Sequence, residues 1–402
     1  MKHAVCIVVD RLSAGFLGAY GNTWIDTPHI DHFASQSTVY DQTLIDSPRL
    51  PVLYDSFWRG SHALVARPAA ALPGLLQAAG TATWLLTDDA EVADLELAAA
   101  FDSRMLVDLP DEPRIADDVA ATHFAEFFAA AAGQLSAIER PTLLWLHTRG
   151  LATTWDAPLL FREAYAGEED PAAPDTADVP GLRLEAEFDP DELLGYAHAY
   201  AGQVTLLDDC LGGLFQSLDE QGLADNTLVL LVAARGFPLG EHGRVGAVQG
   251  DTEGEPLYGE LIQVPLIVRA PGAKGSTRSQ QLIQPLDVYA TLVDWLNGPE
   301  RADDLPLAMN LLKQARPDRQ RRTRAVASGD GGQWALRTPD WLLRHAADER
   351  LELYVKPDDR WEINDVADRC PEVVAALCDA YQATCRGDWT SPVELEQDHE
   401  VA

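Results

Sequence analysis

The chain has 402 residues, 47% of them hydrophobic and 8% aromatic, and its 64 acidic and 30 basic side chains give a net charge of −34. A surface this acidic repels nucleic acid and anionic lipid, so we expect neither a nucleic-acid partner nor a membrane partner. The length allows one large core, or a large and a small one.

Because the sequence predicts no membrane span, no secretory signal and no disulfide framework, we expect a cytoplasmic protein. No stretch approaches the roughly 18 to 20 uninterrupted apolar residues that a membrane span needs. The chain passes from Met1 directly into an apolar strand, which leaves no room for a secretory signal. The 5 cysteines are odd in number and form no Cys-x-x-Cys pair, so they predict neither a disulfide framework nor a zinc site.

The first predicted element is an apolar strand that ends in an acidic residue. Cys6-Ile-Val-Val is followed by Asp10, and the chain then turns through Gly15, Gly18 and Gly21. Such a pattern is typical of a buried parallel strand that delivers its last side chain to the carboxyl edge of a sheet, where α/β proteins bind ligands. A helix N-cap or an ordinary loop carboxylate is the alternative role for Asp10.

Helices and strands alternate through the next hundred residues. The pattern predicts helices over 52–59 and 72–80 and a buried strand over 83–87 that ends in Asp88-Asp89. We expect a loop over 102–114 and a long helix over 115–138, in which His123 is a core or boundary residue rather than a ligand.

The alternation continues to about residue 300. Strands are predicted over 141–147, 227–233 and 261–269, and helices over 193–222 and 285–296. The stretch 163–192 is acidic and rich in Pro, Gly and Ala, so we interpret it as a surface insertion or a lid over the carboxyl edge.

The C-terminal part has a different composition of elements. Short strands over 334–336, 341–345 and 351–355 precede a helix over 371–384, which is typical of a small α+β subdomain. We therefore predict an α/β domain over 1–318, with 163–192 as its insertion, and an α+β subdomain over 319–402.

Several motifs in fixed order resemble those of the sulfatase family, within the alkaline phosphatase superfamily. They are Leu17-Gly-Ala-Tyr-Gly-Asn22, Thr27-Pro-His-Ile-Asp31, Leu239-Gly-Glu-His-Gly243 and Val264-Pro-Leu-Ile-Val-Arg-Ala-Pro271. The resemblance implies a mixed, mainly parallel sheet between helical layers. It also implies sulfate-ester hydrolysis assisted by a divalent ion, although a shared fold is weaker support for a shared activity.

The metal positions implied by the resemblance are largely replaced. Asp10 is kept, Arg11 stands for the second acid, and Ala234 and Arg235 stand for the remaining ligands. Because calcium and magnesium prefer six or more oxygen ligands, we expect no catalytic metal and no other cofactor. A guanidinium from Arg11 or Arg235 is predicted to neutralise Asp10 instead, the alternative being that both arginines point to solvent.

The catalytic positions implied by the resemblance are replaced as well. Leu50 occupies the nucleophile position, Tyr54 the position of the motif arginine, and Ala152 that of the leaving-group histidine. An isobutyl side chain cannot act as a nucleophile. Ser47 and Ser56 are the neighbouring hydroxyls, but neither is predicted to lie at the helix start.

Two functions of different class follow. In the first, the chain is an inactive, degenerate sulfatase whose pocket binds an anionic small molecule or a protein partner, or is structural. The pocket candidates are Asp10, Arg11, Arg49, Arg235 and His242, although the loop motif of His242 is interpreted as structural. In the second, the chain is an active sulfuric- or phosphoric-ester hydrolase with relocated groups, which alone would require calcium or magnesium.

Overall fold

The opening apolar run forms β1 (His3–Val9), a middle strand of a large sheet in which all seven of its residues are buried. The computed structural model describes residues 1–65, 70–108, 113–248, 250, 254–273, 275–298, 308–313 and 322–393. Within these residues, eight strands form the sheet. In spatial order they are β10 (Thr277–Ile283), β2 (Thr38–Thr43), β9 (Leu266–Arg269), β7 (Thr227–Ala233), β1, β5 (Thr142–Thr148), β3 (Ala82–Thr87) and β4 (Ser103–Leu106).

The sheet is mainly parallel. Only β9 runs antiparallel to its neighbours, β2 and β7, while β1 pairs in parallel with β5 and β7. The register places Ile7 beside Leu146 on one side and beside Leu231 on the other. Strands that are buried on both faces need apolar side chains throughout, which explains the unbroken apolar runs of β1 and β7.

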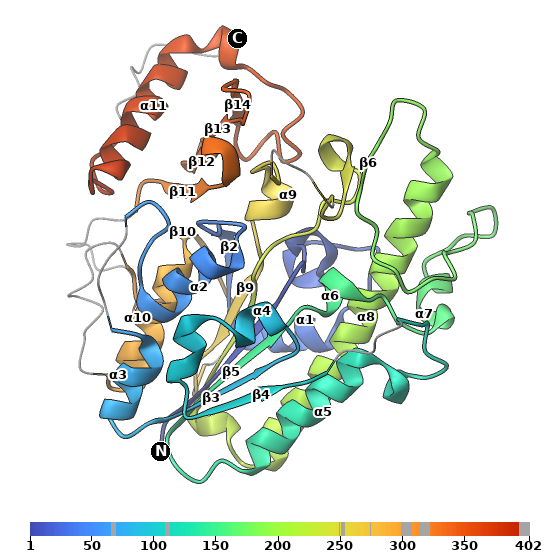
Figure 1. The fold of residues 1–402 in the computed structure, drawn as a ribbon, viewed down its shortest axis with the longest axis vertical. Helices are drawn as coiled ribbons and strands as arrows, with labels where there is room; N and C mark the ends of the chain where they lie inside the picture. The colour runs from blue at the N-terminus through green and yellow to red at the C-terminus, as the bar shows by residue number, and fades with distance from the viewer. Residues whose placement is uncertain are drawn as a thin grey trace.

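Helices cover both faces of the sheet (Figure 1). One layer contains α1, α5 and α8, and the other contains α2, α3 and α10. The helices are α1 (Pro28–Ser35), α2 (Leu50–Arg59), α3 (Leu72–Ala78), α4 (Ala90–Ala93), α5 (His123–Ser136), α6 (Gly150–Thr153), α7 (Leu159–Glu163), α8 (Pro190–Glu220), α9 (Gly259–Ile262), α10 (Pro285–Trp295) and α11 (Pro371–Cys385). The predicted sandwich of a mixed sheet between helices is therefore confirmed.

A second, antiparallel sheet lies beyond the main one. Its strands follow chain order, β11 (Ala325–Ser328), β12 (Trp334–Arg337), β13 (Trp341–His345) and β14 (Leu351–Val355), and α11 packs near them (Figure 1). Several hydrogen bonds join this sheet to the main body, two of them at its first strand. The Ser328 amide donates to the Asp46 carbonyl at 2.8 Å, and Gln284 Nε2 donates to the Val326 carbonyl at 2.8 Å.

The domain division stays a prediction, because the boundary between residues 318 and 319 lies outside the described residues. The lid role of 163–192 stays a prediction as well. In that stretch the structure has the two-residue strand β6 (Leu182–Arg183), which pairs with β8 (Arg244–Val245).

Three predicted segments were wrong in type or extent, and one strand was missed. Residues expected to form a loop include the edge strand β4, whose four side chains are exposed and so lack the apolar signal of a buried strand. The helix expected from residue 115 begins at His123, because the Thr122 hydroxyl caps α5 by accepting from the Ala125 amide. The strand expected from residue 261 begins at Leu266 because α9 precedes it, and the polar edge strand β10 was missed.

Short 3-10 helices complete the described chain. They are η1 (Ala14–Phe16), η2 (Gly18–Tyr20), η3 (Glu96–Ala100), η4 (Val119–Ala121), η5 (Ala224–Asn226), η6 (Glu241–Gly243), η8 (Asp330–Gly332) and η9 (Ala367–Arg369). No helix in the described part of the chain is both long and apolar enough to cross a membrane.

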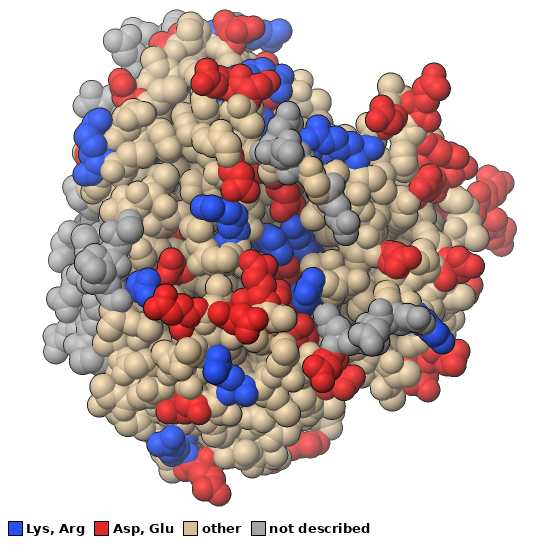
Figure 2. All heavy atoms as spheres, in the orientation of Figure 1, with Lys and Arg blue, Asp and Glu red and all other residues tan. Residues whose placement is uncertain are grey.

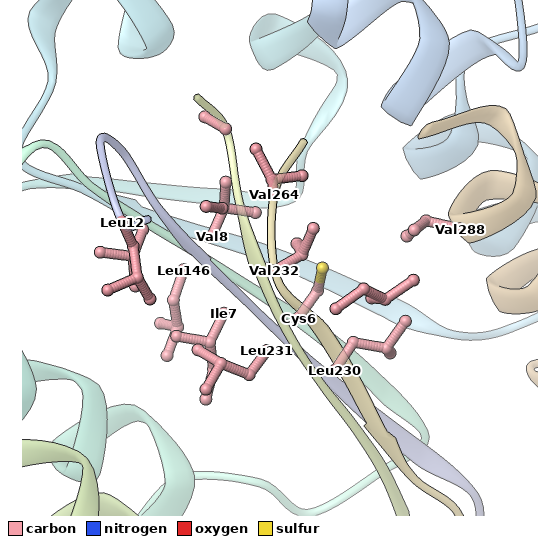
Figure 3. Close-up of a cluster of buried hydrophobic side chains, with 14 of the residues drawn as sticks. Cys6, Ile7, Val8, Leu12, Leu146, Leu230, Leu231, Val232, Val264 and Val288 are labelled. Atoms are coloured by element: carbon pink, nitrogen blue, oxygen red, sulfur yellow. The ribbon is translucent and has the colours of Figure 1, made fainter. Parts of the chain in front are cut away.

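The core on both faces of β1 and β7 has an alternating pattern. Figure 3 shows Ile7 and Leu231 pointing to one side of the sheet, whereas Cys6, Leu230 and Val232 point to the other. All five side chains are at most 2% exposed. This core fixes the strands whose carboxyl ends carry the site described below.

We expect Leu231→Ala to lower the free energy of unfolding by about 3 kcal/mol, because it leaves a cavity where no neighbour can relax fully. Leu160→Ala is the matched control, since Leu160 is 74% exposed and its loss should change stability by less than about 0.5 kcal/mol. Denaturant unfolding monitored by circular dichroism measures both. Equal effects in the two variants would contradict the assigned core.

Candidate functional site

The ends of three strands, β1, β5 and β7, meet at the carboxyl edge of the main sheet. β1 leads into Asp10, whose amide donates to the Thr148 carbonyl at the end of β5 (2.8 Å). β7 leads into Ala234, whose amide donates to the Val9 carbonyl at 3.1 Å. These backbone bonds bring residues far apart in the sequence to one place, as the parallel order of the strands requires.

Asp10 is 1% exposed and forms a two-point ion pair with Arg235. Arg235 Nε donates to Asp10 Oδ1 at 2.9 Å and Nη2 donates to Oδ2 at 2.5 Å. Burial would raise the pKa of Asp10, but the charge and hydrogen bonds of Arg235, with Arg11 and His147, hold it at about 2. Asp10 is therefore ionised at neutral pH and its charge is balanced by a guanidinium.

Arg11 follows Asp10 in the left-handed backbone region, with a φ of 66°. Its guanidinium turns away from Asp10 and donates to Glu255 Oε1 at 2.6 Å and Oε2 at 2.8 Å. Burial favours a higher pKa for Glu255, yet Arg11 lowers it below the usual value. Of the two predicted partners for Asp10, the structure pairs Arg235 with it, and neither arginine points to solvent.

The divalent ion that the resemblance implies does not fit these side chains. Both carboxylate oxygens of Asp10 accept hydrogen bonds from Arg235, and the neighbouring positions are Arg11 and Ala234. Neither an arginine nor an alanine side chain offers an oxygen, whereas calcium and magnesium need several. A cation added here would also meet two fixed positive charges.

A three-residue cluster with a possible metal geometry lies elsewhere among the described residues. His29, Asp208 and Asp209 bring one donor atom each within 4.8 Å of one another, at the contact of α1 with α8. Asp208 already accepts from the backbone amides of His29 (3.0 Å) and Ile30 (2.7 Å). Its carboxylate thus caps the start of α1, which is a structural role.

Leu50 is the first residue of α2 and is 2% exposed. One helical turn further, Tyr54 is fully buried, and its hydroxyl lies 2.6 Å from His147 Nδ1. His147 Nε2 in turn lies 3.6 Å from Asp89 Oδ2. Burial raises the pKa of Tyr54, so its hydroxyl is protonated at neutral pH.

A second buried carboxylate, Asp88, ties three elements together. It accepts from the Thr148 hydroxyl (2.6 Å), the Arg149 amide (2.8 Å) and His123 Nε2 (2.5 Å). His123 is therefore a buried histidine in the core, as predicted, with Nε2 bonded to Asp88 and Nδ1 without a hydrogen-bond partner among the described residues. The sequence predicts Asp88, Asp89 and His147 at the ends of two strands. It did not predict that His123 would bond to Asp88 or Tyr54 to His147.

A surface hollow of about 400 Å³ opens beside Arg235. The residues on its lining that bear on ligand binding are Arg49, Leu50, Glu91, Arg235, Glu255 and Asp330. Arg49 Nε lies 3.5 Å from Asp330 Oδ1, and its side chain is 55% exposed. Basic and acidic side chains stand close together near the middle of the face in Figure 2, so the hollow has no uniform charge.

The remaining predicted positions lie apart from this hollow. His242 forms a hydrogen bond with Glu260 Oε1 at 2.8 Å and does not line the hollow. Ala152 lies on α6 and is half-buried. The two neighbouring serines, Ser47 and Ser56, are fully buried, and the Ser56 hydroxyl bonds to Asp46 and to the Ser61 carbonyl.

Comparisons with known proteins agree with the fold. A profile of the sulfatase family matches residues 2–298. Over 135 residues the chain is 29% identical to the multifunctional alkaline phosphatase superfamily protein PehA of Trinickia caryophylli, a match that covers 33% of this chain and 25% of PehA. Mouse iduronate 2-sulfatase is 26% identical over 133 residues, covering 32% and 23%. These matches span about a quarter of the length of either relative.

Solved structures match over nearly the whole chain. The phosphonate monoester hydrolase of Agrobacterium radiobacter has a TM-score of 0.75 at 15% identity, covering 96% of each chain. BT4656, solved with D-glucosamine-2-N,6-O-disulfate, has a TM-score of 0.73 at 15% identity, covering 98% of this chain and 100% of BT4656. Identities this low show a shared fold and no more. With the profile match over most of its length, the chain belongs to the sulfatase family.

Proposed function

We propose that this sulfatase-family chain does not hydrolyse sulfate esters by a metal-assisted route and that its carboxyl-edge pocket is held together by ion pairs. The observation that carries the proposal is the two-point pair between Arg235 and Asp10. A buried carboxylate needs a cation beside it, and here a side chain of the protein supplies that cation.

The start of α2 supports the same proposal. Leu50 has no nucleophilic atom, and the nearest hydroxyl one turn along, that of Tyr54, is fully buried. Neither residue could therefore form a covalent intermediate with an ester that enters from the hollow.

The contacts of the arginines distinguish between an anion-binding and a structural pocket. Arg11 and Arg235 each direct two nitrogens at one carboxylate, which favours a structural role for both. Arg49 is the more open of the three and is the residue through which a small anion would be bound.

A cytoplasmic location, a protein partner and the lack of nucleic-acid or membrane partners stay predictions from the sequence.

The second candidate function is an active sulfuric- or phosphoric-ester hydrolase with relocated groups. The observation in its favour is the sequence of hydroxyl, imidazole and carboxylate formed by Tyr54, His147 and Asp89. All three side chains are at most 4% exposed, so an ester would reach them only after α2 moved.

Isothermal titration of calcium and magnesium into chelator-treated protein tests the cation site. We expect no heat beyond dilution at about 1 mM ion, because the cation position is filled by Arg235. The control is the double variant Arg11→Asp, Arg235→Asn, which restores oxygen side chains beside Asp10 and is expected to bind calcium. A stoichiometric, tightly held ion in the unmodified protein, confirmed by elemental analysis, would overturn the proposal.

A screen with aryl sulfates and aryl phosphates tests hydrolysis directly. We expect product to form no faster than in buffer alone, since no Ser, Thr or Cys is among the described residues that line the hollow. Turnover that is lost in Tyr54→Phe and in His147→Gln would support the second candidate function instead.

Removal of one partner of the buried ion pair should be costly. We expect Arg235→Met to lower the free energy of unfolding by about 3 to 5 kcal/mol, because Asp10 is left as an unpaired buried charge. Adding Asp10→Asn should recover part of that loss, which a double-mutant cycle measures as a coupling energy. The matched control is the surface pair of Arg278 with Asp41, where Arg278→Met should cost less than about 1 kcal/mol. Equal losses at the two sites would contradict the assignment.

A further inference from the structure

The segment after β14 is anchored in the main body through a buried glutamate. Glu362 is 3% exposed and lies in the left-handed region with a φ of 56°. Its carboxylate accepts from Lys356 Nζ at 2.7 Å and from the Gly259 amide, at the start of α9, at 2.8 Å. Gly259 leaves room for this contact, since a Cβ there would lie 2.6 Å from Glu362 Oε1.

His242 joins the same two parts of the molecule from the Leu239–Gly243 motif. Its Nδ1 lies 2.8 Å from Glu260 Oε1 on α9, and its Nε2 lies 3.1 Å from the Glu362 carbonyl oxygen. The ring stacks on Tyr258 with a centroid distance of 3.5 Å and an interplanar angle of 3°. The side chain is 13% exposed, so water can replace these contacts only in part.

Both hydrogen-bond partners of His242 are pure acceptors. A carboxylate oxygen and a backbone carbonyl oxygen offer no proton, and a neutral imidazole has a single N–H. Only the imidazolium can therefore donate to Glu260 and to Glu362 at the same time. In the neutral ring, one nitrogen lone pair would face an oxygen lone pair.

The charged groups around the ring favour the imidazolium. Glu241 lies beside it in the same turn, Glu260 on α9 and Glu362 in the C-terminal segment. Two basic side chains lie nearby: Lys356 pairs with Glu362, and the Arg344 guanidinium lies 4.0 Å from the centre of the Tyr258 ring. The Tyr258 hydroxyl donates a hydrogen bond to Glu352. Burial alone would lower the pKa of His242, but the hydrogen bonds and charges of Glu260 and Glu362 raise it above the usual value.

We propose that His242 is a protonation-dependent clasp that fastens residues 356–364 to the main body and loosens them when the imidazole loses its proton. This contact joins the turn that holds His242, together with α9, to the segment after β14, and it does not depend on the proposed loss of hydrolysis. It gives a specific physical role to a motif that the sequence alone indicated only as structural.

The direction of the pH effect follows from proton linkage. Because the pKa of His242 is higher in the folded protein than the ordinary value, the clasp is complete below about pH 6.5 and is lost as the pH rises through the raised pKa. The bond from the Gly259 amide to Glu362 persists, so loosening is local rather than global. The loosened segment includes Trp361 and Ile363, which are already 54% and 71% exposed.

Limited proteolysis of the full chain with trypsin measures the clasp. Arg360 lies in the fastened segment and is exposed, whereas Arg386 is an exposed residue at the end of α11. The ratio of cleavage after Arg360 to cleavage after Arg386 cancels the pH dependence of trypsin itself. Between about pH 6 and pH 8.5 we expect this ratio to rise about tenfold, since one charge-assisted hydrogen bond is lost.

Three variants decide the cause. His242→Gln should give a ratio that does not change with pH, and His32→Gln, at an exposed position on α1, should keep the full profile. Glu260→Gln should move the midpoint of the profile to lower pH, because it removes the charge that favours the imidazolium. A ratio independent of pH in the unmodified protein, or the same profile in His242→Gln, would overturn the proposal. Circular dichroism establishes that each variant is folded.

Discussion

The carboxyl edge of this protein depends on how the charge of Asp10 is balanced. Asp10 sits at the end of a central strand that is buried on both faces, and taking an unpaired carboxylate out of water costs several kcal/mol. Backbone N–H groups of the neighbouring strands cannot stabilise the carboxylate, because β5 and β7 use them for hydrogen bonds within the sheet. A cation at this position is a requirement of the fold, whatever the chemistry of the pocket.

A guanidinium meets this requirement differently from a metal ion. A guanidinium carries one positive charge, whereas calcium or magnesium carries two. Its N–H groups lie in one plane, so a single carboxylate can accept two parallel hydrogen bonds from one side of it. Arg235 directs its remaining nitrogen, Nη1, at the Pro48 carbonyl at 3.3 Å, just before α2. The same side chain therefore connects the ends of β1 and β7 with the segment that leads into α2, three places that a metal site would join through separate ligands.

The sequence predicted the central strands of the main sheet but not all of its edge strands. β1, β5 and β7 were found because strands buried on both faces are apolar throughout, whereas their order in the sheet was not predicted. β4 and β10 were missed because neither edge strand has a continuous apolar run: β4 has four exposed residues, two of them apolar, and β10 is polar until its last two residues. At the site, the replacement of the family's functional positions stays a prediction, whereas the structure does have an arginine that neutralises Asp10. The sequence did not show which arginine would pair with Asp10, because the partner of Arg11, Glu255, is 244 positions away and carries no sequence signal that connects the two.

The pairing of Tyr54 with His147 joins residues 93 positions apart, and its consequence reaches beyond the pair. Tyr54 lies one helical turn after Leu50, near the buried start of α2. Its ring packs against Trp58 and Trp145, and this packing holds the start of α2 against β5. Each buried polar group here has its partner on a neighbouring element: the neutral phenol of Tyr54 lies against His147, and the guanidinium of Arg235 pairs with Asp10. The two pairs are also linked, because the charge of His147 acts on Asp10. Since these groups share partners, their effects on stability should be coupled, and a single substitution cannot separate the chemistry of the pocket from the packing that holds its strands together.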